Sequence, residues 1–325
     1  MACRGPISVP PPVSEPFHEE VVDAGPGDAP FEVAFGPHEA GALVPVEQCE
    51  VPPIPAEDAG GPVVQIDVPY GPDIHQIYDL SWPDAPAKAL VILIHGGGWT
   101  SGTAKLFVPT IRQLVSLGYA AASVGYRLAR TVESAFPMGL ADTRCAVREV
   151  QALAAARGIR KTILLGASAG GHLAAMIALA GDETKFDGDC PKKGPIHVDA
   201  AIAYYPPIDL EHAREHYPPK MNQAVDELLR EDAGALWMAK AKEATPLHYV
   251  DARDPPMLFL HGAADPIVPI EDSRAMDRAL REAHVPSLLI ELPEEKHGFF
   301  VLGRRDSLRT ASCTVLHFLE TTASN

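Results

Sequence analysis

The segment of residues 161–179 holds a serine between a strand and a helix, and this arrangement limits the fold more than any other feature. Residues 162–165 are apolar or β-branched and predict a buried strand, while the small residues of 171–180 predict a helix. Between them stands a G-x-S-x-G pattern centred on Ser168. Such a corner strains the serine backbone, so the positions two before and two after it must lack side chains.

Strand and helix patterns alternate along the rest of the chain. Apolar runs predict further strands at residues 89–94, 119–124, 198–204, 256–260 and 287–291, with helices at 103–117, 135–156, 270–283 and 306–319. Two earlier runs, 63–68 and 75–80, predict an antiparallel pair joined by a turn. This alternation predicts an α/β fold with a mainly parallel sheet, helices on both faces and ligands at its carboxyl edge.

Four chemical features follow four different strands of this predicted sheet. They are the glycine triplet of residues 96–98, Ser168, Asp265 and His297. Their order suits a nucleophilic serine, a histidine that takes its proton and an aspartate that holds the imidazole tautomer. Three glycines after a core strand leave backbone N–H groups open to a ligand, so Gly97 and Gly98, together with Ala169, are predicted to bind an oxyanion.

Six segments, four of which contain these features, give the chain a family resemblance. They are HGGGW (95–99), YRLA (126–129), GASAGGHLA (166–174), YYPPIDL (204–210), HGAADPIVP (261–269) and HGFF (297–300). Together they resemble the esterase/lipase branch of the α/β-hydrolase fold related to hormone-sensitive lipase and kynurenine formamidase. The resemblance covers about residues 74–320.

This resemblance implies hydrolysis of a small-molecule carboxylic ester, without cofactor or metal, through an acyl-enzyme on Ser168. It also places oxyanion donors in the HGGG segment, and leaves open which pair among Gly97, Gly98 and Trp99 is used. Gly125 stands where the lipase branch usually has aspartate, which favours the formamidase-like and feruloyl or acetyl esterase side.

Two other functions remain open at this stage. An amidase or formamidase, or a peptidase of the prolyl-oligopeptidase kind, shares the G-x-S-x-G-G pattern; the absence of a propeller-sized N-terminal domain argues against the peptidase. An inactive binding protein on the same fold is the other alternative, and the complete set of Ser168, Asp265 and His297 argues against it.

Several polar residues near these motifs have structural interpretations. His95 and His172 are expected to be hydrogen-bonded structural residues, and Asp142 to fix a loop from the start of a helix. Glu294 and Glu295 are alternative acids, but they lie on the predicted loop of the histidine.

Residues 206–255 form a long excursion after the sixth strand and predict a cap over the site, with helices near 225–230 and 233–240. Within it, Trp237 and Met238 are expected to line an acyl pocket, with packing of the cap as the alternative.

The first 62 residues differ in composition from the hydrolase domain predicted for residues 63–325. They hold thirteen prolines and eleven acids against one arginine, which predicts an extended tether without catalytic residues. Cys3 before a proline-rich stretch resembles the mature start of a bacterial lipoprotein, with an ordinary cysteine as the alternative. The expected location is therefore cytoplasmic, or secreted and membrane-tethered if Cys3 carries a lipid.

Charge and cysteine content exclude other classes of function. The net charge of −16 without a basic stripe argues against nucleic acid or an anionic membrane as partner, and no apolar run predicts a membrane span. The five cysteines lack metal-site spacing. At most two disulfides can form, and Cys145 and Cys313 are expected instead to be buried thiols.

Overall fold

The computed structural model of the protein describes residues 49, 51–55, 61–230 and 234–324. Every described residue belongs to one compact unit. The prediction for Cys3 and most of that for the tether of residues 1–62 lie outside the described residues.

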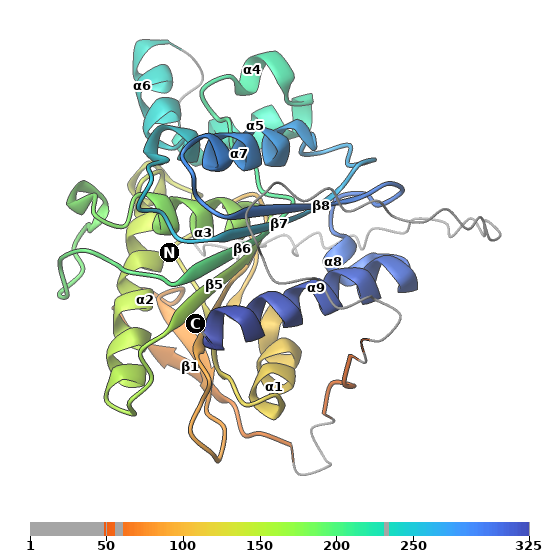
Figure 1. Ribbon diagram of the computed structural model, residues 1–325. Helices are drawn as coiled ribbons and strands as arrows, with labels where there is room; N and C mark the ends of the chain where they lie inside the picture. Colours follow the sequence, from red (N-terminus) through yellow and green to blue (C-terminus); the bar gives the residue numbers. More distant parts are fainter. Residues whose placement is uncertain (1–48, 50, 56–60, 231–233, 325) are drawn as a thin grey trace, which may run out of the picture. The chain divides into compact units, whose positions relative to one another are not determined.

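The described residues form one eight-stranded sheet, as predicted mainly parallel (Figure 1). Its strands are β1 (Gln65–Pro69), β2 (Ile77–Ser81), β3 (Leu90–Ile94), β4 (Ala120–Val124), β5 (Thr162–Ala167), β6 (Ala200–Tyr204), β7 (Met257–Gly262) and β8 (Ser287–Leu292). Their order in the sheet is β1-β2-β4-β3-β5-β6-β7-β8. The pairs β1–β2 and β2–β4 are antiparallel, and all later pairs are parallel. The carboxyl ends of β3 and β5 to β8 therefore meet at one edge.

Helices cover both faces of this sheet (Figure 1). The long ones are α1 (Val108–Ser116), α2 (Met138–Ala155), α3 (Ala169–Leu179), α7 (Glu271–Glu282) and α9 (Arg305–Ser324), and the short ones are η2 (Ala104–Phe107), η3 (Val132–Ser134), η4 (Thr184–Phe186) and α8 (Phe299–Leu302). One hydrophobic cluster joins α2, α3 and α7 to one face, and a second joins α1 and α9 to the other. Strand β3 is buried throughout, with Ile92 in the first cluster and Val91 and Leu93 in the second. Burial on both faces explains its unbroken apolar run.

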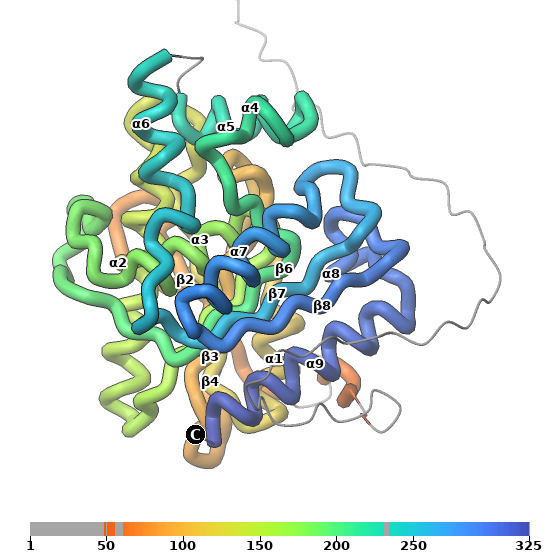
Figure 2. The backbone as a smooth tube through the Cα atoms, turned by 45° about the horizontal axis from the view of Figure 1, so that its top comes forward, coloured from red at the N-terminus to blue at the C-terminus, as the bar shows by residue number. Residues whose placement is uncertain are grey.

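The insertion predicted after the sixth strand is present. It comprises α4 (Ala213–His216), α5 (Pro219–Leu229), α6 (Ala235–Glu243) and η5 (Pro246–Tyr249), and Figures 1 and 2 both show α4, α5 and α6 grouped together. Helix α5 begins six residues before its predicted start, with Pro219 at the first helical position that proline suits. Its last turn joins the main domain, because the backbone N–H of Phe136 donates to Leu228 at 2.8 Å.

The expectation that Cys145 and Cys313 are thiols is wrong. Cys145 is bonded to Cys190, 45 positions away, and Cys313 to Cys49, 264 positions away. Their Cα atoms lie 5.5 and 6.0 Å apart, within the range a disulfide requires. Only the fold brings these pairs together, and their spacing in sequence carries no sign of it. Disulfides are typical of proteins that fold in oxidising compartments.

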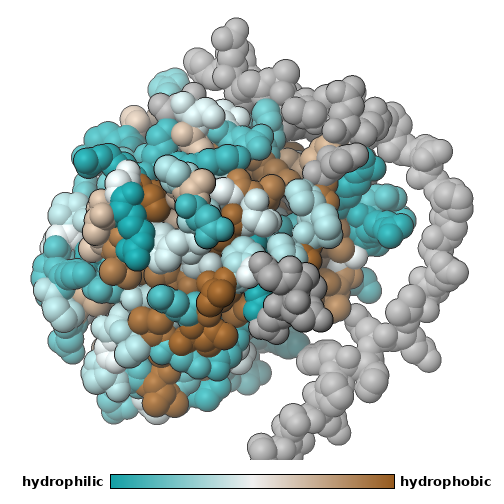
Figure 3. All heavy atoms as spheres, turned by 90° about the horizontal axis from the view of Figure 1, so that it is seen from below, coloured by the Kyte–Doolittle hydropathy of each residue, from teal (hydrophilic) through white to brown (hydrophobic). Residues whose placement is uncertain are grey.

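The surface mixes both kinds of side chain. Seen from below, hydrophobic residues form patches between hydrophilic ones (Figure 3). Val63, Ile74 and Leu302 are among the most exposed large apolar side chains of the described residues. Among the described helices, none combines the length and apolar character that a membrane span requires.

Candidate active site

The corner between β5 and α3 has the strained geometry that its sequence predicts. Ser168 stands there with φ 54° and ψ −122°, an unusual conformation for a residue other than glycine. A Cβ at Gly166 would lie 2.1 Å from the carbonyl oxygen of Gly170, and one at Gly170 would lie 2.0 Å from that of Ile94. Both positions therefore require glycine, one to close the corner and the other to let it pack against β3.

The structure brings Ser168, Asp265 and His297 into one hydrogen-bonded chain. His297 Nε2 lies 2.9 Å from Ser168 Oγ, and His297 Nδ1 lies 2.7 Å from Asp265 Oδ2. With the proton on Nδ1 donated to the carboxylate, Nε2 accepts the serine hydroxyl. The Asp265 side chain is fully buried, whereas that of His297 is 19% exposed.

The surroundings of Asp265 favour its charged form. Its Oδ1 accepts the backbone N–H groups of Ile267 and Val268 at 2.8 and 3.0 Å, and His261 Nε2 lies 3.5 Å from Oδ2. Burial alone would raise the pKa of this carboxyl. The contact with His261, whose Nε2 also lies 2.9 Å from the carbonyl oxygen of Val268, and the hydrogen bond from His297 outweigh that effect and hold the pKa of Asp265 well below its usual range. The Asp265 side chain is therefore charged and accepts the Nδ1 proton of His297.

The two glutamates on the histidine loop have other partners. Glu294 is largely exposed and pairs with Arg304, and Glu295 is buried and accepts the Arg304 backbone N–H at 3.0 Å. The carboxylate that contacts His297 belongs to Asp265.

The glycine loop after β3 lies directly against the serine corner. A Cβ at Gly96 would lie 2.7 Å from the carbonyl oxygen of Ala167 and 3.2 Å from Ser168 Cβ. The next three residues all have positive φ: 112° at Gly97, 57° at Gly98 and 60° at Trp99. Within the described part of the chain, the backbone N–H groups of these three residues and of Ala169 donate no hydrogen bond. N–H groups without an acceptor next to the serine corner are available to bind a negatively charged oxygen.

The two neighbouring histidines are buried and hydrogen-bonded, as expected. His95 donates from Nδ1 to the carbonyl oxygen of Gly96 at 2.8 Å and stacks on Tyr126, with ring centroids 4.4 Å apart. His172 lies between Trp99 and Ala244 and bonds to both. Burial lowers the pKa of each imidazole to about 4. Both are therefore neutral near pH 7.

Asp142 fixes a loop, as predicted, from the second turn of α2. Its carboxylate accepts the backbone and side-chain N–H groups of Arg127 at 2.6 to 2.9 Å, and Gln76 donates to it at 2.8 Å. It thereby holds the YRLA segment beside the glycine loop, since the N–H of Ala129 donates to Trp99 at 2.9 Å.

Two residues of the site were not identified from the sequence. The Tyr205 ring packs on the imidazole of His297 with centroids 4.6 Å apart, and its φ of 38° is unusual for tyrosine. His261 contacts Asp265 and is anchored by Ser273 Oγ, 2.7 Å from Nδ1. Both stand in segments that carried the resemblance, YYPPIDL and HGAADPIVP, and this was the available signal.

The residues proposed for substrate binding lie in the insertion. Trp237 is 2% exposed, donates from its indole to Asp226 at 2.9 Å and packs against Arg214. Met238 is 46% exposed on α6. Trp237 thus packs the insertion, and contact of Met238 with a substrate stays a prediction.

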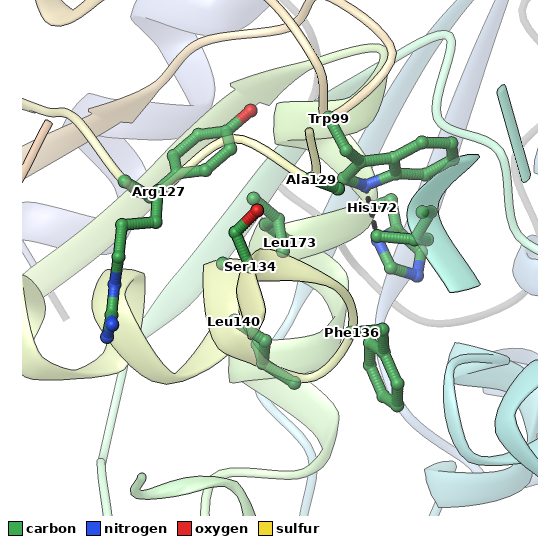
Figure 4. A pocket seen from close by; sticks show the side chains of 11 residues that line it. Trp99, Arg127, Ala129, Ser134, Phe136, Leu140, His172 and Leu173 are labelled. Atoms are coloured by element: carbon green, nitrogen blue, oxygen red, sulfur yellow. Dashed lines mark hydrogen bonds between the residues drawn. The ribbon is translucent and has the colours of Figure 1, made fainter. Parts of the chain in front are cut away.

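A small cavity lies next to Trp99 and His172 (Figure 4). Its volume is about 10 Å³, enough for one water molecule, and Trp99, Phe136, His172 and Leu228 are among the residues that line it. Ser168, Asp265 and His297 do not line it. Within the described residues, no group of three or more His, Cys, Asp or Glu side chains is placed to hold a metal ion.

Comparison with known proteins places this chain in a family. The family model BD-FAE matches residues 77–280, which is more than half of the chain. The chain belongs to the BD-FAE family. The match contains Ser168 and Asp265 and ends before His297.

This BD-FAE chain is also similar to curated bacterial proteins. It is 32% identical over 245 residues to "Esterase LipQ" of Mycobacterium tuberculosis, covering 72% of this chain and 56% of LipQ. It is 28% identical over 252 residues to "Esterase LipC" of the same organism, covering 74% of this chain and 60% of LipC. The BD-FAE chain thus spans a little over half the length of these relatives.

Solved structures share the fold of this BD-FAE chain. A carbohydrate esterase from gut microbiota superposes with a TM-score of 0.71 at 23% identity, covering 83% of this chain and 99% of that structure. Propionate-bound esterase Est2 of Thermogutta terrifontis gives 0.64 at 27% identity, with coverage of 81% and 94%. The BD-FAE chain has the α/β-hydrolase fold that its sequence predicts.

Proposed function

We propose that this protein is a serine carboxylic ester hydrolase that acts on short- to medium-chain acyl esters through an acyl-enzyme. The observation that supports this most strongly is the chain of contacts from Ser168 Oγ through His297 to the buried Asp265, with distances of 2.9 and 2.7 Å. Ser168 also stands on a strained strand-to-helix corner, where α/β-hydrolases place their nucleophilic serine.

In the proposed first step, Ser168 Oγ attacks the ester carbonyl carbon and gives its proton to His297 Nε2. Asp265 keeps the other imidazole proton on Nδ1 and stabilises the imidazolium, because the pKa of its carboxyl is held low by its hydrogen-bond donors. When the tetrahedral intermediate collapses, the imidazolium protonates the leaving alcohol. A water molecule then repeats the sequence on the acyl-enzyme, releases the acid and restores the serine.

The negative oxygen of both tetrahedral intermediates would be bound by backbone N–H groups. Gly97, Gly98 and Ala169 are the leading donors, and Trp99 is the alternative within the loop. The Ala169 N–H opens helix α3, whose N-terminal dipole also favours negative charge there.

Two observations support a short acyl group. Ala224 of α5 lies close above the glycine loop, since its Cβ is 3.6 Å from where a side chain at Gly98 would begin. The insertion of residues 206–255 would then act as a cap that limits the space over the loop. Est2, at 27% identity, has been solved with propionate and with butyrate bound.

The test is labelling and turnover of Ser168→Ala beside Ser116→Ala, a control on the exposed surface of α1. A fluorophosphonate probe should label wild type and Ser116→Ala and leave Ser168→Ala unlabelled. Hydrolysis of p-nitrophenyl acetate should fall by at least about 10³-fold in Ser168→Ala alone. An unlabelled, inactive wild type would instead favour a binding protein. Faster cleavage of an aryl amide than of the matching ester would favour an amidase.

A further inference from the structure

The glycine loop ends in a residue whose backbone conformation is unfavourable. Trp99 has a φ of 60°, a region that bulky residues rarely occupy, so the surrounding structure must hold it there. Its side chain is 2% exposed and serves as the anchor of the loop. Figure 4 shows the indole directed at the imidazole of His172, with a hydrogen bond drawn between them.

His172 stands on α3, the helix that begins directly after Ser168. Its backbone N–H donates to the carbonyl oxygen of Ser168 at 3.0 Å, one helical turn away. Its side chain accepts the Trp99 indole N–H at Nδ1, 3.2 Å away, and the two rings meet edge to face at 90°. One side chain therefore links the helix that provides the Ala169 N–H to the loop that provides the others.

The hydrogen bonds determine the tautomer of this imidazole. An indole N–H can only donate, so Nδ1 of His172 must carry no proton. Nε2 then carries the proton and donates to the carbonyl oxygen of Ala244, 2.7 Å away, at the C-terminal end of α6. Full burial lowers the pKa of His172 to about 4, although the hydrogen bond to Ala244 opposes this effect. Because the ring is therefore neutral near pH 7, Nδ1 remains an acceptor.

We propose that His172 is a positioning residue of the ester hydrolase: through Trp99 it holds the N–H groups of the glycine loop in register with that of Ala169. This inference rests on the proposed function. It assigns to a buried histidine that touches neither substrate nor His297 a role in the geometry of the oxyanion site. A bond that only stabilised the fold would leave kcat unchanged.

The test compares His172→Phe, Trp99→Phe and the double variant with Thr245→Val. Phenylalanine at 172 keeps a ring but neither bond. Thr245 is a matched control, because it is equally buried next to Ala244 and its hydroxyl bonds Ala241 and Glu211 at 2.9 Å without reaching the loop. The readouts are kcat and KM for p-nitrophenyl acetate, and the indole N–H resonances of the three tryptophans.

The expected result has three parts. His172→Phe moves the Trp99 indole resonance, and kcat falls about 10- to 100-fold with KM within about twofold, because a misplaced donor weakens transition-state binding most. Trp99→Phe gives a similar loss from the other side of the bond. The double variant falls no further than the worse single variant, since both break one interaction. Thr245→Val keeps the wild-type kcat.

Other results overturn the inference. They are an unmoved Trp99 resonance in His172→Phe, a kcat that drops no more than in Thr245→Val, or losses that multiply in the double variant. If His172→Phe does not fold, Trp99→Phe decides by the same kcat criterion. An inactive wild-type chain would refute the proposed function itself, whereas an active wild type beside an unaffected His172→Phe refutes only the role of His172.

Discussion

Replacing Ser168 by glycine should make the protein inactive and more stable than the alanine variant. Ser168 has φ 54° and ψ −122°, a conformation that glycine adopts freely and that costs a residue with a Cβ about 1–3 kcal/mol. Ser168→Ala keeps this strain, because alanine retains the Cβ. Both variants lose the hydrogen bond to His297, so that loss cancels in the comparison.

The size of the difference follows from two opposing effects. Relief of strain favours Ser168→Gly by about 1–3 kcal/mol, and the greater freedom of glycine in the unfolded chain costs it about 0.5–1 kcal/mol. The free energy of unfolding of Ser168→Gly should therefore exceed that of Ser168→Ala by about 1 kcal/mol, which corresponds to a Tm difference of about 1.5–2 °C for a domain of this length.

Urea denaturation and thermal melts of the two variants measure this difference, with ester hydrolysis absent from both. If Ser168→Gly is less stable than Ser168→Ala by about 0.5–1 kcal/mol, the greater freedom of glycine in the unfolded chain explains the whole difference. The serine corner would then carry no strain, and the reasoning from its backbone geometry would fail.

Three further predictions address the acid, the pH dependence and a disulfide. Asp265→Asn should fold, because its amide oxygen still accepts the N–H groups of Ile267 and Val268. Its kcat should fall about 10³- to 10⁴-fold, while Glu294→Gln keeps a kcat near that of wild type. Equal kcat values for the two variants would point to another acid. Burial lowers the pKa of His95 and His172 from 6.5 to about 4. As pH falls, these histidines therefore bind protons in the unfolded chain at a higher pH than in the folded protein. Between pH 6.5 and 4, each of them lowers the free energy of unfolding by about 1.4 kcal/mol for every pH unit. Urea titrations should show His95→Gln losing its share of this slope, and an unchanged slope would mean that the histidine is not held neutral. Cys145→Ala removes the disulfide that closes a loop of 45 residues and should lower the free energy of unfolding by about 4 kcal/mol, with kcat unchanged in the folded protein. Thermal melts and low-temperature activity assays beside wild type measure both effects.

The sequence by itself predicted the order of the strands and main helices and pointed to Ser168, Asp265 and His297 as the candidate site. Apolar runs indicate burial, and the residues of β3 are all apolar because both faces of this strand are covered. Once the sheet is parallel, residues that follow different strands meet at one edge whatever their distance in sequence. Ser168, Asp265 and His297 could therefore be grouped before any coordinates were known. The glycines around Ser168 could be explained from backbone sterics alone.

Only the tertiary structure decided which side chains on different elements meet. The disulfide from Cys49 to Cys313 joins residues 264 positions apart, and the bond from Trp99 to His172 depends on the direction of two buried rings. Tyr205 reaches His297 because its own backbone turns to φ 38°. Periodicity gives the face on which a residue lies and does not give its rotamer or its partner across the core. Such contacts depend on packing between distant segments, and so they are settled only when the whole domain has folded.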